Sequence, residues 1–221
     1  MSASRVAASR FSAKSPARAS AANASRKPAS SFAYAAGAVN VLYGSASGLS
    51  AAGSQLWDQD SAGVLGTAEM DDSFGAALAA GDFDGDGRVD LAVGVSGESV
   101  NGLASAGAVN VLYGAASGLT SARNQLWHQD SAGIIGTAEE NDQFGDALAA
   151  ADFNGDGRAD LAVGVPTETV NGATWAGAVN VLYGSASGLT SAGNQLWTQD
   201  STGVPGTPNT GAEFGCALAG R

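Results

Sequence analysis

The chain has 221 residues, a hydrophobic content of 44%, and 32 glycines against 5 prolines. This length suits one large domain or two small ones, and this composition favours many short strands joined by glycine turns over long helices. Residues 1–30 carry a charge of +6 and residues 31–221 carry −17, which together give the net charge of −11. So acidic a body repels a phosphate backbone, which excludes nucleic acid as a partner and favours cations.

The first segment, residues 1–30, is basic and rich in serine and alanine. It lacks the apolar central stretch of a secretory signal, so we predict a disordered leader. No run of 18 apolar residues occurs in the chain, so we expect no insertion into a membrane. Cys216 is the single cysteine, which excludes an internal disulfide.

The remainder of the chain repeats every seventy residues. The segment AGAVNVLYG begins at residues 36, 106 and 176, QLW begins at 55, 125 and 195, and FG begins at 74, 144 and 214. The interval never changes, which indicates duplication of one structural unit. We therefore divide the chain into a partial unit, two complete units and the stub of a further one, with bounds 31–69, 70–139, 140–209 and 210–221.

Each complete unit is expected to hold four strands. In the first complete unit these are residues 74–83, 90–95, 107–114 and 124–130, separated by glycine-bearing loops that include residues 114–122. No segment has a helical apolar period, so the fold class is all-β. Four short antiparallel strands that cannot bury both faces alone are typical of a β-propeller blade. About three units make an incomplete propeller, so we expect a segment of a longer protein. An open alternative pairs the trailing strand with the leading half-unit.

The stretch GDFDGDGRVD, residues 81–90, carries four aspartates. Counted from Asp82, carboxylates occupy positions 1, 3, 5 and 9, and glycine at position 6 permits a sharp turn. We expect Asp82, Asp84, Asp86 and Asp90, with the Arg88 carbonyl, to surround one cation. Hard oxygen ligands at flexible distances suit Ca²⁺ better than Mg²⁺, and no histidine or cysteine lies nearby to favour zinc.

A second copy of the loop, ADFNGDGRAD at 151–160, keeps the same spacing. Its predicted ligands are Asp152, Asn154, Asp156, the Arg158 carbonyl and Asp160. Because asparagine replaces one carboxylate, we expect weaker binding here than in the first loop. An EF-hand loop is longer, ends in glutamate and lies between helices, so neither loop is an EF-hand.

These residues resemble a known family. FGAALAAGDFDGDGRVDLAVGVSG followed by AGAVNVLYG is similar to the FG-GAP repeat of the integrin α-chain N-terminal propeller and its bacterial relatives, with GVS at 94–96 and GVP at 164–166 where the family has GAP. The resemblance spans roughly residues 36–221. It implies a seven-bladed propeller in complete members, with structural Ca²⁺ in hairpin loops between the first two strands of certain blades.

The function expected from these features is a non-enzymatic, calcium-binding propeller segment that acts in adhesion or protein binding. Its ligand would be a protein or a glycan, and its setting the cell surface or the extracellular space, where Ca²⁺ is abundant. One alternative is a fragment of a propeller-based hydrolase or lyase, and another is a structural scaffold that self-associates through unpaired blade edges. Glu98 and Glu168 are the nearest acid–base candidates, but they repeat with the unit and show no partner, so we expect surface loops and no catalytic residues.

Overall fold

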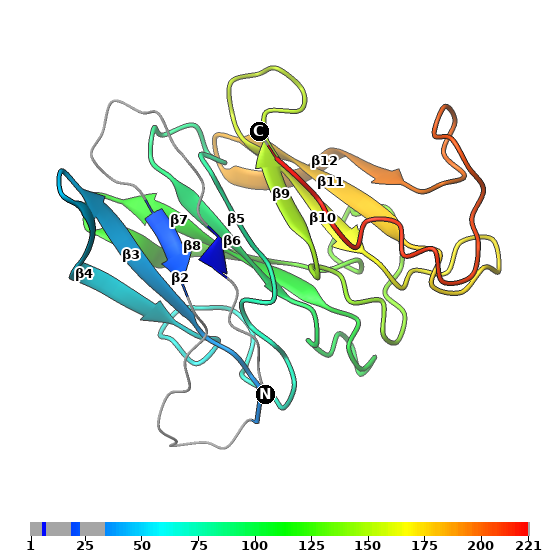
Figure 1. Cartoon of the computed structure of the whole chain (residues 1–221), viewed down its shortest axis with the longest axis horizontal. Helices are drawn as coiled ribbons and strands as arrows, with labels where there is room; N and C mark the ends of the chain where they lie inside the picture. The colour runs from blue at the N-terminus through cyan, green and yellow to red at the C-terminus, as the bar shows by residue number, and fades with distance from the viewer. Residues whose placement is uncertain (1–5, 8–18, 23–33, 221) are drawn as a thin grey trace.

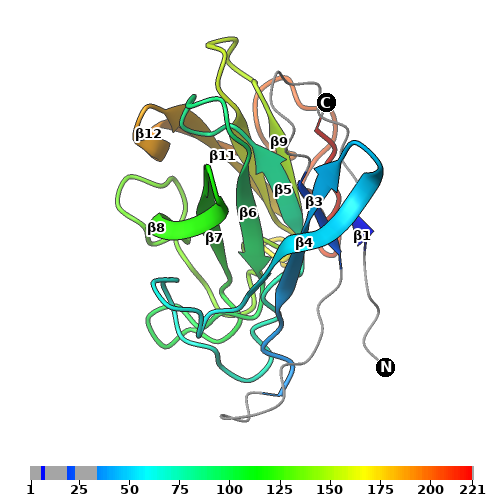
Figure 2. The same ribbon diagram turned by 90° about the vertical axis from the view of Figure 1, so that its left-hand side faces the viewer.

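The computed structural model describes residues 6–7, 19–22 and 34–220. Its strands form three four-stranded sheets, in which sequential strands pair antiparallel and lie side by side. Figures 1 and 2 show the three sheets following one another across the molecule in chain order. No helix occurs in the described ranges, and so none there could cross a membrane. The all-β class and the blade architecture are thus confirmed.

The first sheet holds β1 (Val6–Ala7), β2 (Ala19–Ala22), β3 (Val39–Ser45) and β4 (Gly48–Trp57). The predicted leader contributes its six described residues to this sheet as β1 and β2. The other residues of the leader, to which the prediction of disorder also applied, lie outside the described residues.

The second and third sheets have matching strands. The second consists of β5 (Leu78–Gly81), β6 (Asp90–Val95), β7 (Ala108–Ala115) and β8 (Gly118–Trp127). The third consists of β9 (Leu148–Ala151), β10 (Asp160–Val165), β11 (Ala178–Ser185) and β12 (Gly188–Trp197).

The fourth strand of each unit is longer than the sequence predicts. Ala115 pairs with Gly118, so only two residues form the turn of the β7–β8 hairpin, and most of the predicted loop 114–122 is strand. The register shifts between Val111 and Tyr113, and Gly118 takes a φ of +111°, a backbone conformation that favours glycine. A bulge and one glycine therefore replace the longer loop.

The two larger hydrophobic clusters lie between neighbouring sheets. One cluster joins the first and second sheets through Val41, Val93 and Leu112, and a second joins the second and third sheets through Val111 and Leu182. β6 and β10 are buried along their whole lengths, because each is a central strand covered on both faces. A unit thus depends on its neighbours for its core, as expected of a repeat protein.

The FG dipeptides join one unit to the next. The Phe74 amide donates to the Ala36 carbonyl at 2.7 Å, and the Phe144 amide donates to the Ala106 carbonyl at 2.9 Å. Both rings are buried, with 1% and 0% of their surface exposed. Gly107 has a φ of +85° and lies so close to the Phe144 backbone that a Cβ atom there would overlap it. The recurring glycine and phenylalanine are thus requirements of unit-to-unit packing.

Candidate calcium site

The first acidic loop connects β5 to β6 and is folded around its own carboxylates. Asp82 accepts hydrogen bonds from the Asp86 amide at 3.0 Å and from the Gly87 amide at 2.8 Å, while Asp84 accepts another from the Asp86 amide at 3.1 Å. Gly85 and Gly87 have φ values of +74° and +86°, which glycine adopts without strain. The alternating glycines let the chain turn tightly, so that successive aspartates face one centre.

Three of the predicted ligands meet in this loop. One carboxylate oxygen from each of Asp82, Asp84 and Asp86 lies within 4.8 Å of the others, the one such group of acidic, histidine or cysteine side chains in the described part of the chain. All the donors are hard oxygen atoms, which is the chemistry that Ca²⁺ prefers. The loop therefore fits a calcium ion by its donor set.

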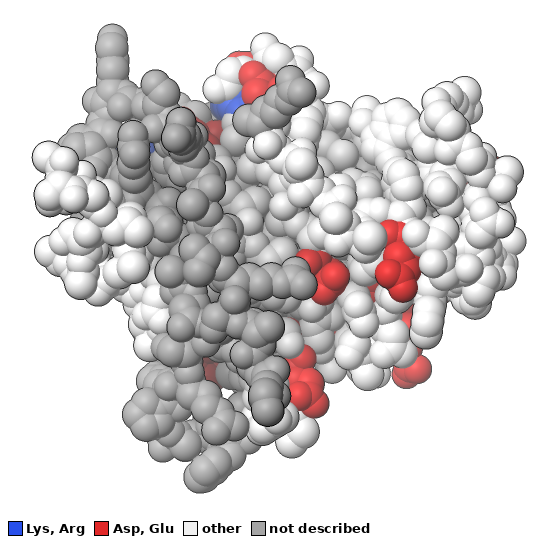
Figure 3. Space-filling model, viewed as in Figure 1, with Lys and Arg blue, Asp and Glu red and all other residues white. Residues whose placement is uncertain are grey.

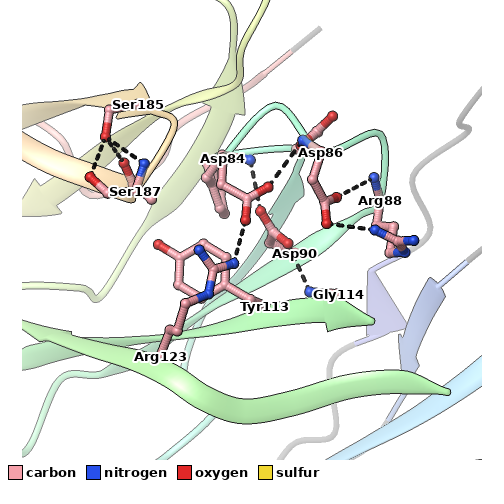
Figure 4. Close-up of polar contacts among 12 residues, drawn as sticks. Asp84, Asp86, Arg88, Asp90, Tyr113, Gly114, Arg123, Ser185 and Ser187 are labelled. Atoms are coloured by element: carbon pink, nitrogen blue, oxygen red, sulfur yellow. Dashed lines mark hydrogen bonds and ion pairs between the residues drawn. The ribbon is translucent and has the colours of Figure 1, made fainter. Parts of the chain in front are cut away.

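Asp90 has a different position from the one expected. It lies outside the group of three, and its two oxygens accept hydrogen bonds from the Phe83 and Gly114 amides, both at 2.8 Å. Its side chain is buried, and burial raises its pKa to about 7, with smaller contributions from the nearby aspartates. In this structure Asp90 attaches the loop to β7, and its role as a metal ligand stays a prediction (Figure 4).

Two arginines supply positive charge to the loop. Arg88 forms an ion pair with Asp86 at 2.7 Å, and Arg123 of β8 forms one with Asp84 at 2.5 Å. The Arg123 guanidinium also lies over the ring of Tyr113, 4.8 Å from its centroid. Figure 4 shows the Arg123 side chain reaching Asp84 from below the loop. The basic and acidic side chains that lie together at the top of Figure 3 belong to the second acidic loop, between β9 and β10. Arg123 was not among the residues predicted for this site; its signal in the sequence is the glycine at the corresponding positions of the sister units, Gly53 and Gly193.

The second loop, between β9 and β10, repeats the backbone pattern. Asp152 accepts hydrogen bonds from the Gly155, Asp156 and Gly157 amides at 2.7, 3.1 and 2.9 Å. The side-chain oxygen of Asn154 accepts a hydrogen bond from the Asp156 backbone amide at 2.8 Å. In the first loop the Asp84 carboxylate accepts the equivalent hydrogen bond from the Asp86 amide. Asp160 again attaches the loop to the next strand, through the Phe153 and Gly184 amides. The Arg158 guanidinium lies 3.6 Å from Asp156, a longer pair than its counterpart.

The two loops differ in burial. In the first loop Phe83 is fully buried, the Phe83 carbonyl accepts the Ser185 amide at 3.2 Å, and the Asp82 carbonyl accepts the Ala159 amide at 2.9 Å. These contacts cover the start of the first loop, residues 82–84, with the following unit, while residues 85–88 stay exposed. Phe153, the counterpart of Phe83, leaves 47% of its surface exposed. Two loops of similar sequence thus occupy different environments.

Glu98 and Glu168 are not the unpartnered surface residues that we expected. The Gln59 amide group donates to Glu98 at 2.5 Å, and the Gln129 amide group donates to Glu168 at 2.6 Å. Burial, followed by repulsion from Asp72, raises the pKa of Glu98 to about 7. Burial and the matching aspartate do the same for Glu168. Each pair joins adjacent units across 39 residues, a contact that repeats because the unit repeats.

Comparison with known proteins identifies the repeat. The protein-family model described as "FG-GAP repeat" matches residues 74–112 and 144–182. Each match runs from the FG dipeptide through the acidic loop into the third strand of a sheet. The family resemblance noted from the sequence is confirmed.

The matching curated relatives are enzymes. Phosphatidylinositol-glycan-specific phospholipase D of Rattus norvegicus is 39% identical over 114 residues, which is 52% of this chain and 13% of that protein. The Bos taurus protein of the same name is 34% identical over 130 residues, 59% of this chain and 14% of that protein. The chain thus spans about a seventh of their length. This finding contradicts the prediction of a non-enzymatic protein. The prediction failed because repeated residues describe the scaffold and carry little information about an enzyme of which the scaffold is one part.

Proposed function

Because the chain carries FG-GAP repeats, we propose that it is the calcium-bound propeller portion of a hydrolase related to phosphatidylinositol-glycan-specific phospholipase D. The observation that carries this proposal is the 34–39% identity to enzymes of that name over more than half of the chain. The substrate class would be a phosphatidylinositol-glycan, and the setting outside the cell. An extracellular setting agrees with the use of Ca²⁺, which is abundant there.

Under this proposal the acidic loops hold Ca²⁺. Asp82, Asp84 and Asp86 would bind the ion in the first loop, with the predicted help of the Arg88 carbonyl and Asp90. In the second loop the corresponding residues are Asp152, Asn154, Asp156, the Arg158 carbonyl and Asp160. When bound, the ion neutralises carboxylates that otherwise repel one another, which stabilises the hairpin between the first two strands of a blade.

The chain's own residues would connect this hairpin rigidly to the rest of its blade. Asp90 and Asp160 each bridge the acidic loop to the third strand of their sheet through backbone amides, at 2.8 and 2.9 Å from Gly114 and Gly184. Bound Ca²⁺ would therefore stabilise three strands of a blade rather than one loop. Adhesion, the function first expected from the sequence, has weaker support than this enzymatic context.

A thermal melt with Ca²⁺, Mg²⁺ or EDTA tests the calcium part of the proposal. We expect Ca²⁺ to raise the melting temperature of the full chain, and Asp86→Ala together with Asp156→Ala to abolish the rise. Asp146→Ala is a matched control, because this aspartate lies outside both loops. Melts that superimpose in all three conditions would reject calcium binding.

The hydrolase part needs a separate assay. The longer enzyme of which this chain would be the propeller portion is incubated with vesicles that carry a phosphatidylinositol-glycan-anchored reporter protein, and released reporter is measured in the supernatant. We expect release in Ca²⁺ and none in EDTA. A longer protein that binds Ca²⁺ through this propeller but releases no reporter would contradict the enzymatic assignment and favour a binding module.

A further inference from the structure

We propose that Arg123 is a tethered cation that lowers the calcium affinity of the first acidic loop by holding Asp84. This inference rests on the proposed calcium function and concerns how that site is regulated by the chain's own residues. It assigns a role to the ion pair between β8 and the loop, a contact that the fold does not require, since the sister units lack it.

The position of Arg123 is well defined by two contacts. Its guanidinium pairs with a carboxylate oxygen of Asp84 at 2.5 Å, and its Cζ atom lies 4.8 Å from the centroid of the Tyr113 ring. The Asp84 side chain is only 4% exposed, whereas that of Arg123 is 53% exposed. The arginine therefore reaches in from the surface to a buried carboxylate, as Figure 4 shows.

The backbone at Arg123 is better suited to glycine. Arg123 has a φ of +63°, and its counterparts Gly53 and Gly193 have φ values of +72° and +73°. Left-handed backbone is costly for a residue with a Cβ atom, so this conformation alone does not favour arginine. Its presence in one unit is consistent with a function of the side chain.

The arginine occurs in the unit that has the additional carboxylate. Asp84 is replaced by Asn154 in the next unit, and Arg123 is replaced by Gly193. Counted over corresponding residues, the first loop thus carries one more negative charge and one more positive charge than the second, so the two differences cancel. The carboxylate of Asp84 is the reason to expect tighter calcium binding in the first loop. Its negative charge is offset by the positive charge of Arg123, which contacts it.

A bound Ca²⁺ and the guanidinium would compete for the same carboxylate. If Asp84 turns one oxygen to the ion, the fixed positive charge beside it still repels the ion. Even with the screening of bulk water, a doubly charged ion and a unit charge several ångströms apart change the binding constant on the order of tenfold. We therefore expect the first loop to bind Ca²⁺ no more tightly than the second, in contrast to the order expected from the carboxylates alone.

Calorimetric titration of the full chain with CaCl₂ tests the inference. In a background of Asp156→Ala, which disables the second loop, we compare Arg123, Arg123→Gly and Arg123→Lys. We expect Arg123→Gly to tighten calcium binding about tenfold and Arg123→Lys, which retains the charge, to leave it close to the parent value. Glycine is safe for folding here, because both sister units have it with the same backbone conformation.

Asp84→Asn supplies the second arm of the experiment. Alone, it should weaken binding, since it removes a carboxylate and leaves the arginine. Combined with Arg123→Gly, this substitution gives the first loop the residues that the second unit has, asparagine and glycine. The calcium affinity of the first loop should then equal that of the second loop, which is measured separately in an Asp86→Ala background that disables the first loop.

The outcomes separate the inference from the function on which it rests. Calcium binding that is unchanged by Arg123→Gly would overturn the role of Arg123 and leave the calcium site intact. An equal gain in affinity from Arg123→Lys would overturn it as well, because the charge would then not be the cause. No heat of binding from any variant would overturn the proposed calcium function and this inference together.

Discussion

The pairs that join Gln59 to Glu98 and Gln129 to Glu168 should make the stability of this protein depend on pH. Both glutamates have a pKa raised to about 7 by burial, with a further contribution from Asp72 or its counterpart. The neutral acid also carries an O–H donor, and the side-chain oxygens of Gln59 and Gln129 are buried without a hydrogen-bond partner. The folded state therefore favours protonated glutamates.

The sign follows from linkage. Because the folded pKa of about 7 exceeds the ordinary value of 4.5, this stabilisation is fully present below pH 4.5 and is lost as the pH rises through about 7. At 1.36 kcal/mol per pH unit the difference corresponds to about 3 kcal/mol for each glutamate. Since both side chains are only half-buried, water screens the effect, and we take about 1.5 kcal/mol each.

Urea unfolding at pH 5 and pH 8 measures this loss. The experiment is done in EDTA, so that metal binding does not contribute. Between the two pH values we expect the two glutamates to lower the wild-type free energy of unfolding by about 3 kcal/mol. Asp90 and Asp142, whose pKa values are also raised, add a further fall that the variant below keeps. Glu98→Gln with Glu168→Gln, which keeps the shape and an acceptor for each glutamine, should remove most of the fall due to the glutamates. A double variant with the wild-type pH dependence would refute the reasoning.

Two further predictions use sister residues as matched controls. Phe83→Ala should cost about 3–5 kcal/mol, because the ring is fully buried, whereas Phe153→Ala, at a ring that is 47% exposed, should cost about 1 kcal/mol, as measured by urea unfolding. Tyr113→Phe should cost about 1–2 kcal/mol, since its hydroxyl donates to Gln125 and accepts the Leu189 amide at 3.1 Å. Tyr183→Phe should cost less than about 0.5 kcal/mol, because its hydroxyl forms no hydrogen bond within the described residues. Equal losses within either pair would contradict the burial and the bonding on which these values depend.

The architecture was predictable because its signals are local. The continuous apolar run DLAVGV and the alternation in AVNVLYG predict strands, and the constant interval of seventy residues predicts the succession of sheets. The aspartate spacing likewise predicted that Asp82, Asp84 and Asp86 converge. Each of these inferences needs only neighbours in sequence and the geometry of a turn.

Other features depend on how separate segments pack, and the sequence did not reveal them. The pair of Arg123 with Asp84 spans 39 residues and forms because β8 passes beneath the acidic loop. The pair of Gln59 with Glu98 spans the same interval between two units. The position of Asp90 was missed for a related reason, since its partner Gly114 belongs to another strand.

The near-identity of the repeated units has a consequence for how the strands pair during folding. β6 and β10 have the identical sequence DLAVGV, and β7 and β11 share AVNVLYG. A strand from one unit would meet nearly the same side chains, in the same register, if it paired within the other unit or within a second molecule. Side-chain recognition therefore discriminates weakly between correct and exchanged pairings, and the short connections along one chain must select the correct ones. At high protein concentration, strands of other molecules compete with those joined by the short connections. Refolding under that condition therefore favours domain-swapped assemblies.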